Sequence, residues 1–282
     1  MAHTQKYLRN LFLSLTIIFI FYSCNNSEES TMGTPVNIIF LHHSTGGIIW
    51  KGGLSGIARR LGFDGDVRRW FNNFNKRNEK NYLITEASFP KETPYGWRND
   101  PYDYYNIWVE NAGNEPYKEE PTLEMLTGKY NVIVFKHCFP VSNIEPDTTA
   151  PDIKSVKRTL GNYKLQYNAL KEKMHQFPKN KFIVWTPPAQ VKSNTNEEEA
   201  IRAQEFSNWV KLEWDIKGDN IFIWDFRELE TEGSLYLKDS YADSPTNSHP
   251  GKNFAEHVAP YFCQRIVDVI EGRGDSSSLT GK

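Results

Sequence analysis

The chain has 282 residues and a formal net charge of −2, and 14% of its residues are aromatic. A near-neutral chain lacks the basic surface that nucleic-acid binding requires, so the composition argues against a nucleic-acid partner. A length of this order suits one α/β domain. The high aromatic content suits sugar-binding faces and a large core equally well.

The first residues predict export. Lys6 and Arg9 precede an apolar run at residues 11–22, which is too short to span a bilayer as a helix. Ser23 and Cys24 close this run. A basic flank, a short apolar core and a small residue before a cleavage point are typical of a signal peptide at residues 1–23.

This N-terminus also resembles a bacterial lipoprotein signal, in which the Cys becomes the lipidated first residue. The acidic pair Glu28 and Glu29 resembles the surface-export tag of Bacteroidota lipoproteins. The resemblance implies a palmitate-bearing membrane anchor at Cys24, a tether at residues 24–35, and a place at the outer membrane with exposure at the cell surface. The alternative is an ordinary signal peptide with a chance Cys.

Five short apolar runs predict buried strands, at residues 36–41, 82–87, 131–136, 182–185 and 221–225. Amphipathic patterns predict helices at residues 153–177, 196–214 and 253–270. Continuous apolar strands that alternate with helices are typical of a parallel sheet covered on both faces. We therefore expect one α/β domain over residues 36–272, with three α/β/α layers and a central parallel sheet of about five strands.

Two segments fall outside this pattern. Residues 89–130 are rich in Pro, Gly, Tyr and Trp and predict a long ordered insertion over the top of the sheet. Residues 273–282 are polar and predict a flexible tail, in which the literal Gly-Asp-Ser at 274–276 is interpreted as chance. Cys138 and Cys263 could form a disulfide or remain as two free thiols.

Polar residues beyond the strands are the candidates for chemistry, because open parallel sheets bind ligands outside the carboxyl ends of their strands. Ser44 follows the first predicted strand, Asn143 follows the third, and His249 precedes the last helix. A neutral Ser hydroxyl needs a base within hydrogen-bond reach, and a His has an ordinary pKa of about 6.5, near working pH. These residues predict a nucleophilic site with Ser44 as nucleophile and His249 as general base.

The layout resembles that of the SGNH (GDSL-like) hydrolases, with a nucleophilic Ser after the first strand and a His-Pro pair before the last helix. The separation of Ser44 and His249 (249 − 44 = 205 residues) fits that layout. The α/β-hydrolase pattern, with its Ser in a central G-x-S-x-G elbow, does not occur in the sequence. The resemblance is closest to a branch with HHSTG, CFP and SHP signatures, and it implies an SGNH/flavodoxin-like fold and serine esterase activity without a cofactor.

The resemblance also places the oxyanion hole. The family's second-block Gly corresponds to Gly96, and its Gly-x-Asn-Asp block corresponds to the segment around Asn143. Fixed donors stabilise the developing oxyanion, so we expect the Gly96 N–H, the Asn143 amide and the Ser44 N–H in this role. Each residue has a structural alternative: a helix cap for Ser44, a helix-entry residue for His249, and turn residues for Asn143 and Gly96.

The family's acidic residue, three positions before the His, falls at Thr246, which has no charge. We expect Asp243 to orient His249 instead, because a carboxylate stabilises an imidazolium better than an amide does. Asn247 and a backbone carbonyl are the alternatives.

Substrate contacts are expected from His43, Trp97 and Tyr104. The segment 97–108 mixes aromatic residues with carboxylates and an Arg, which suits either a carbohydrate-binding rim or the packed core of an insertion. His42 and His43 could also be metal ligands, but adjacent residues at a strand end point to opposite faces and no third ligand is evident, so no metal is expected.

These observations predict a serine esterase that removes O-acetyl or other acyl groups from a carbohydrate. The substrate rests on analogy, because a fold by itself specifies no substrate. The alternative is a non-catalytic glycan-binding surface lipoprotein with a degenerate hydrolase fold, which the missing acid at Thr246 favours.

Overall fold

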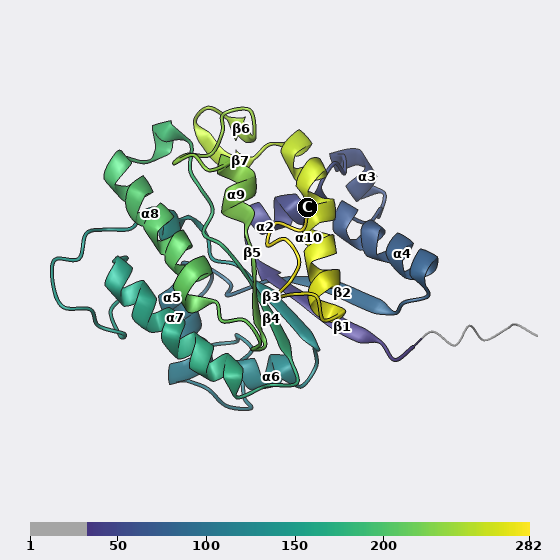
Figure 1. Cartoon of the computed structure of the whole chain (residues 1–282), viewed down its shortest axis with the longest axis horizontal. Helices are drawn as coiled ribbons and strands as arrows, with labels where there is room; N and C mark the ends of the chain where they lie inside the picture. The colour runs from purple at the N-terminus through teal and green to yellow at the C-terminus, as the bar shows by residue number, and fades with distance from the viewer. Residues whose placement is uncertain (1–32) are drawn as a thin grey trace, which may run out of the picture. The chain divides into compact units, whose positions relative to one another are not determined.

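The computed structural model describes residues 33–282, shown in Figure 1. The predicted signal peptide, the lipidation site Cys24 and most of the predicted tether lie outside these residues. Residues Thr34–Lys282 form one compact unit. No helix of this unit has both the length and the apolar character that crossing a bilayer requires.

A parallel five-stranded sheet with the order β2-β1-β3-β4-β5 forms the centre of this unit. Its strands are β1 (Val36–His42), β2 (Tyr82–Ser88), β3 (Val132–Phe135), β4 (Lys181–Trp185) and β5 (Ile221–Trp224). All five apolar runs therefore form strands, each within one residue of the predicted bounds at its start and end. The order places β1 and β3 side by side, so the residues that follow these two strands are neighbours.

Helices cover both faces of the sheet (Figure 1). One face is packed by α2 (Thr45–Lys51), α4 (Asp66–Asn78), α9 (Phe226–Thr231) and α10 (Lys252–Ile270), and α3 (Gly56–Arg60) follows α2. The other face is packed by α5 (Pro101–Tyr105), η1 (Asn106–Glu110), α6 (Leu123–Thr127), η2 (Phe139–Ser142), α7 (Leu160–His175), α8 (Glu197–Trp209) and η4 (Val210–Trp214). The predicted three-layer α/β/α fold is confirmed.

The alternation of side chains along β1 explains its sequence. Ile38 and Phe40 belong to the apolar cluster with α10, whereas Ile39 and Leu41 belong to the cluster with α7. All four side chains are at most 2% exposed. A strand that is buried on both faces has apolar residues at every position, so its sequence is a continuous apolar run.

The helix predictions are accurate at their carboxyl ends and less so at one amino end. Helices α8 and η4 together fill 197–214, and α10 fills 252–270, within one residue of the predictions. Helix α7 begins at Leu160 rather than at residue 153. The Thr159 hydroxyl caps it by accepting a hydrogen bond from the Asn162 N–H at 3.4 Å.

The segment 89–130 connects β2 to β3, and its aromatic part packs on one face of the sheet rather than over its top. Pro90 and Asn99 do lie at the carboxyl ends of the strands, where their carbonyls accept from the His43 ring and the Cys138 N–H. Tyr104 and Trp108 are fully buried, and their rings contact Phe135 of β3 at centroid distances of 5.3 and 5.2 Å. Its aromatic residues thus supply the apolar surface that a long crossover helix would otherwise supply.

The predicted flexibility of residues 273–282 is not borne out by their contacts. The Trp224 ring N–H donates to the Thr280 carbonyl at 2.9 Å, and the Asp225 N–H donates to the Leu279 carbonyl at 2.9 Å. The buried Arg265 guanidinium donates to the Gly274 carbonyl at 2.7 Å. The backbone carbonyls of this polar segment satisfy donors that would otherwise be buried without partners.

Cys138 and Cys263 are both free thiols, as in one of the two alternatives left open by the sequence. Cys263 is fully buried in the cluster around α10. Cys138 is half-buried just beyond β3.

Candidate active site

Ser44 lies between β1 and α2 and is exposed. Its backbone has φ 42° and ψ −101°, a conformation that a residue with a side chain rarely adopts and that stores strain. The Gly46 N–H donates to the His43 carbonyl at 2.9 Å, and the Ile48 N–H donates to the Ser44 carbonyl at 3.1 Å. These hydrogen bonds of the first turn of α2 therefore hold the strained backbone of the candidate nucleophile in place.

Gly46 makes this turn possible through close packing. A Cβ at this position would lie 2.5 Å from the Cβ of His42, so only Gly lets α2 start directly against the end of β1. The His42 ring in turn bonds Glu86 of β2 at 2.8 Å. The glycine thus positions the turn at the carboxyl edge of the sheet.

A short hairpin brings the histidine to the same edge. Strands β6 (Ala242–Ser244) and β7 (Asn247–Pro250) pair antiparallel, with Ser244 opposite Asn247. Buried Ser248 fixes the hairpin, because its hydroxyl accepts from the Val191 N–H at 3.1 Å and from the Asn194 amide at 3.0 Å. These bonds leave the side chain of His249 on the side of Ser44.

One continuous series of hydrogen bonds joins four side chains. The Ser44 hydroxyl donates to Nε2 of His249. Nδ1 of His249 donates to the Asn247 amide oxygen at 2.7 Å, and the Asn247 amide nitrogen donates to an Asp243 carboxylate oxygen at 2.9 Å. Because the amide oxygen can only accept, the imidazole carries its proton on Nδ1 and directs its lone pair at Ser44. This tautomer is the one that a general base needs.

The structure argues against a capping role for Ser44. It stands at the N-cap position of α2, yet its hydroxyl makes no cap hydrogen bond to that helix. The hydroxyl bonds His249 instead. A cap function would orient the oxygen at the helix amides, so the observed geometry favours the nucleophile over the cap.

The expectation that Asp243 contacts His249 is wrong in its geometry. Asn247 occupies that place, and Asp243 lies one residue further along the series of hydrogen bonds. The Asn247 oxygen also accepts from the backbone N–H of His249 at 3.1 Å. An Asn that folds back on the amide two residues ahead forms an Asx turn, and this local turn places the amide oxygen under the ring.

The pKa of His249 is lowered, first by burial, then by the positive charge of Lys136, and Asp243 opposes the change. A lowered pKa means that the neutral, basic form of the imidazole persists to more acidic pH than in an ordinary histidine. Such a group is suited to act as a base at neutral pH.

Of the expected oxyanion donors, Gly96 is not available. Its N–H donates to the Glu92 carbonyl at 2.6 Å, which closes a local turn. The amide oxygen of Asn143 accepts from Gln190, and no contact in residues 33–282 joins Asn143 to Ser44 or His249. The Ser44 N–H has no acceptor within the described part of the chain, so it is free to meet an oxyanion.

Two expected substrate contacts are core residues instead. Trp97 is 7% exposed and Tyr104 is fully buried, with its hydroxyl donating to the Lys136 carbonyl at 3.1 Å. Their position matches the alternative of a packed core. His43 is half-buried, and its ring bonds the Pro90 carbonyl beside the candidate nucleophile.

Phe139 is a site residue that the sequence analysis did not single out. Its ring contacts the His249 ring edge-on, at a centroid distance of 5.3 Å. It lies in the Cys-Phe-Pro motif that carries the family resemblance, and this motif could have indicated Phe139 from the sequence. Its half-buried ring borders the space beside the histidine.

Glu230 of α9 is fully buried near this edge of the sheet. One carboxyl oxygen accepts from the Ala189 N–H at 2.7 Å, and the other has no hydrogen-bond partner. Burial raises the pKa of Glu230 to about 8. The folded state therefore holds this proton at neutral pH.

Replacing Glu230 by Gln is expected to stabilise the fold at pH 8. Between the ordinary pKa of 4.5 and the folded pKa of about 8, the unfolded protein releases a proton that the folded protein keeps, so stability falls as pH rises through this window. Each pKa unit corresponds to about 1.4 kcal/mol, so the gain at pH 8 amounts to a few kcal/mol and vanishes near pH 4.5. Urea unfolding at both pH values measures it, with exposed Glu228→Gln of the same helix as control. Equal stability of wild type and Glu230→Gln at pH 8 would refute the argument.

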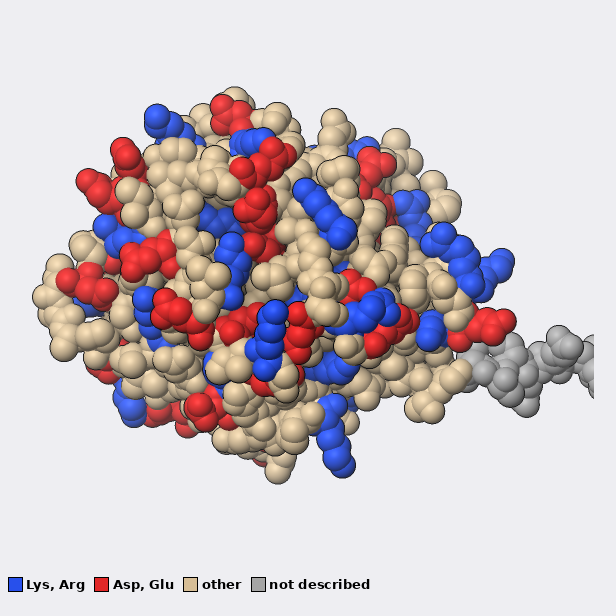
Figure 2. Space-filling view, viewed as in Figure 1, with Lys and Arg blue, Asp and Glu red and all other residues tan. Residues whose placement is uncertain are grey.

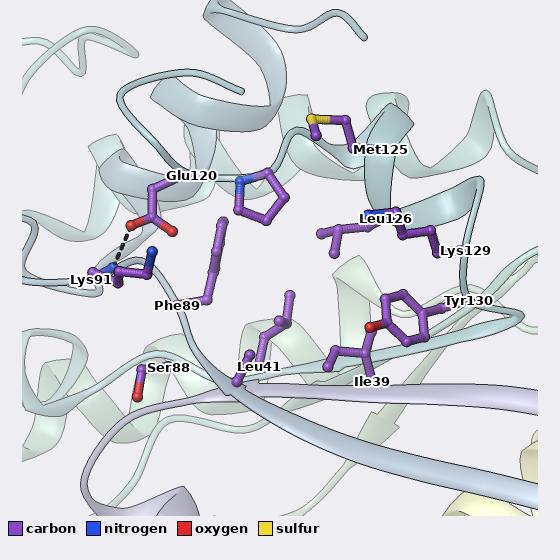
Figure 3. Close-up of a pocket in the computed structure, with 12 residues that line it drawn as sticks. Ile39, Leu41, Ser88, Phe89, Lys91, Glu120, Met125, Leu126, Lys129 and Tyr130 are labelled. Carbon is purple, nitrogen blue, oxygen red and sulfur yellow. Dashed lines mark hydrogen bonds between the residues drawn. The ribbon is translucent and has the colours of Figure 1, made fainter. Parts of the chain in front are cut away.

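An apolar pocket of about 200 Å³ lies elsewhere, between the β1–β2 region and α6 (Figure 3). Among its polar lining residues is Glu120, whose carboxylate accepts from the Lys91 N–H at 2.7 Å. Neither Ser44 nor His249 lines it. This pocket is therefore separate from the candidate active site, at which Ser44 is exposed.

The surface seen in Figure 2 carries acidic and basic side chains interspersed, without a large patch of one sign. Within residues 33–282 no group of three or more His, Cys, Asp and Glu side chains is arranged to hold a metal ion.

No family model and no curated protein sequence matches this chain. Solved structures that resemble it include a candidate acylhydrolase from Bacteroides fragilis, with 12% identity and a TM-score of 0.36, over 86% of this chain and 96% of that one. Another is a carbohydrate esterase whose active site displays divergent catalytic and non-catalytic binding functions, with 13% identity and a TM-score of 0.38. This match covers 84% of this chain and 66% of the esterase. The roles of residues in this protein rest on its own geometry.

Proposed function

We propose that the protein is a serine ester hydrolase of the SGNH type, with Ser44 as nucleophile, His249 as general base and Asn247 as the group that orients the base. The observation that carries this proposal is the series of hydrogen bonds from the strained, exposed Ser44 through His249 to Asn247. A nucleophile bonded to a base that is itself oriented by a third group is the signature of covalent catalysis.

The proposed reaction has two halves. His249 Nε2 takes the proton of Ser44 as Oγ attacks the ester carbonyl, and the oxyanion faces the Ser44 N–H. The imidazolium then gives its proton to the departing alcohol, which leaves an acyl group on Ser44. Water, deprotonated by the same nitrogen, attacks this acyl group, and the collapse releases the acid and restores the hydroxyl.

The substrate that we propose is an acylated carbohydrate, with O-acetyl as the main acyl group. An exposed serine at an open edge of the sheet is accessible to an ester on a bulky polymer, which a closed pocket would exclude. A screen of the purified protein against acetylated polysaccharides and short-chain aryl esters tests the substrate class. A fluorophosphonate probe tests the chemistry, because labelling that depends on Ser44 means an enzyme, whereas the absence of labelling favours a glycan-binding protein.

We propose further that the protein is exported and anchored by lipid at Cys24, on the basis of the short apolar run that ends at Ser23. Replacing Cys24 by Ser is expected to move the protein from the membrane fraction to the soluble fraction, or to block processing. Fractionation followed by immunoblotting measures this, with Ser23→Ala as control. Full membrane retention of Cys24→Ser would contradict lipid anchoring.

A further inference from the structure

Lys136 is a buried lysine directly beyond the central strand β3, and it is 1% exposed. Its ammonium donates to the Cys138 sulfur at 3.4 Å. No carboxylate in residues 33–282 forms an ion pair with it. Burial of an ammonium without an ionic partner is expensive, so its retention points to a use for the charge.

The contacts of its neighbours place this ammonium at the candidate active site. Leu41 of β1 pairs with Phe135 of β3, so the next residues along the two strands, His42 and Lys136, adjoin each other two positions before Ser44. The residue after Cys138 is Phe139, whose ring packs against His249. The charge of Lys136 acts on both His42 and His249, so the ammonium lies near the Ser–His pair.

Three titratable side chains near this ammonium, Glu230, His42 and His137, are neutral at neutral pH, and Glu86 bonds the His42 ring. Burial raises the pKa of Glu230 to about 8, so this neighbouring carboxyl is mostly protonated. Burial lowers the pKa of His42, and it lowers the pKa of His137 to about 3, so both rings are neutral. On the Nδ1 side of the His249 ring, the carboxylate of Asp243 is bonded to Asn247 and opposes the lowering of the His249 pKa.

We propose that Lys136 is the fixed positive charge toward which the oxyanion develops on the substrate carbonyl oxygen when Ser44 attacks. This inference rests on the proposed function. Gly96 and Asn143 do not supply the expected donors, and a charge beneath the strand end stabilises an anion in their place. The imidazolium that forms at the same time is stabilised from its other side by the Asn247 oxygen and by Asp243. Lys136 is buried and touches no substrate atom, so it acts electrostatically and is a positioning residue rather than a catalytic one.

The test is the rate at which a fluorophosphonate probe labels Ser44 across pH 4–10 in the full folded protein. Attack on phosphorus also develops an oxyanion. Lys136→Met is expected to slow the plateau rate by about tenfold to a hundredfold. The loss of the positive charge also raises the pKa of His249, so the acid limb shifts to higher pH. Lys136→Arg keeps the positive charge, so the acid limb of its labelling profile is expected to stay at the wild-type pH. Lys171→Met removes another buried ammonium, bonded to the Trp214 carbonyl on the opposite face of the sheet, and is expected to change neither.

A second variant keeps the inference testable if Lys136→Met does not fold. Glu230 ionises above pH 8 in the wild type and then compensates Lys136, so the labelling rate is expected to fall there, and Glu230→Gln is expected to abolish this fall. A wild-type labelling rate and acid limb in Lys136→Met would overturn the inference about Lys136 but not the proposed function. A fall in labelling rate above pH 8 that persists in Glu230→Gln would do the same. Failure of the wild type to label at Ser44 would overturn the proposed function.

Discussion

Replacing Ser44 by Ala is expected to abolish ester hydrolysis and labelling by a fluorophosphonate, and His249→Ala is expected to do the same. Loss of a nucleophile or its base lowers turnover by roughly 10⁴-fold or more in serine hydrolases. The two groups act as one unit, so the double variant should be little worse than either single variant. Turnover of an activated aryl ester under saturating substrate measures each effect.

Two controls sharpen this experiment. Ser276→Ala removes the serine of the literal Gly-Asp-Ser at 274–276, whose hydroxyl only donates to the Arg273 carbonyl, and should leave activity unchanged. Ser44→Ala should leave the unfolding midpoint near that of the wild type, because Ser44 is exposed and its hydroxyl caps no helix. Near-wild-type turnover in folded Ser44→Ala would refute the assignment of the nucleophile.

The positions of Ser44 and His249 could be predicted because they depend on simple rules. Strands that are buried on both faces have continuous apolar sequences, so their carboxyl ends can be located from the sequence. Parallel strands then bring these ends to one edge of a sheet. The hydrogen bond between Ser44 and His249, across 205 residues, joins a residue selected in this way to one that precedes the last helix, where the family resemblance places the base.

The local geometry of the site could not be predicted, for two reasons. Strands β6 and β7 are only three and four residues long and lack apolar alternation, so the hairpin that places Asn247 has no clear sequence signal. Aromatic residues such as Trp97 and Tyr104 suit a surface and a core equally, and only the packing shows that they are core. Lys136 is the last residue of the predicted strand at 131–136, where a charged side chain is ordinary and indicates no function.

The hydrogen bonds of Asn247 make it the residue that sets the state of the base. Its amide oxygen accepts from both the backbone N–H and Nδ1 of His249, at 3.1 and 2.7 Å. Asp243 accepts from the amide nitrogen at 2.9 Å, which fixes the orientation of the amide group. An amide oxygen carries only a partial charge, so the imidazolium is stabilised less than by a carboxylate. This difference predicts how each substitution will act.

Asn247→Ala is expected to lower turnover by roughly a hundredfold to 10⁴-fold, because the imidazole loses the partner that fixes its tautomer. Asn247→Asp should retain activity, and its carboxylate should raise the pKa of His249 and move the acid limb of the pH–rate profile to higher pH. Asp243→Asn should cost about tenfold or less, since it acts only through Asn247, and Thr246→Ala in the exposed turn should have no effect. The pH–rate profile of an aryl ester measures all four variants. If Asp243→Asn loses most activity while Asn247→Ala stays fully active, Asp243 rather than Asn247 orients His249. If both variants stay fully active, Ser44 and His249 act as a dyad.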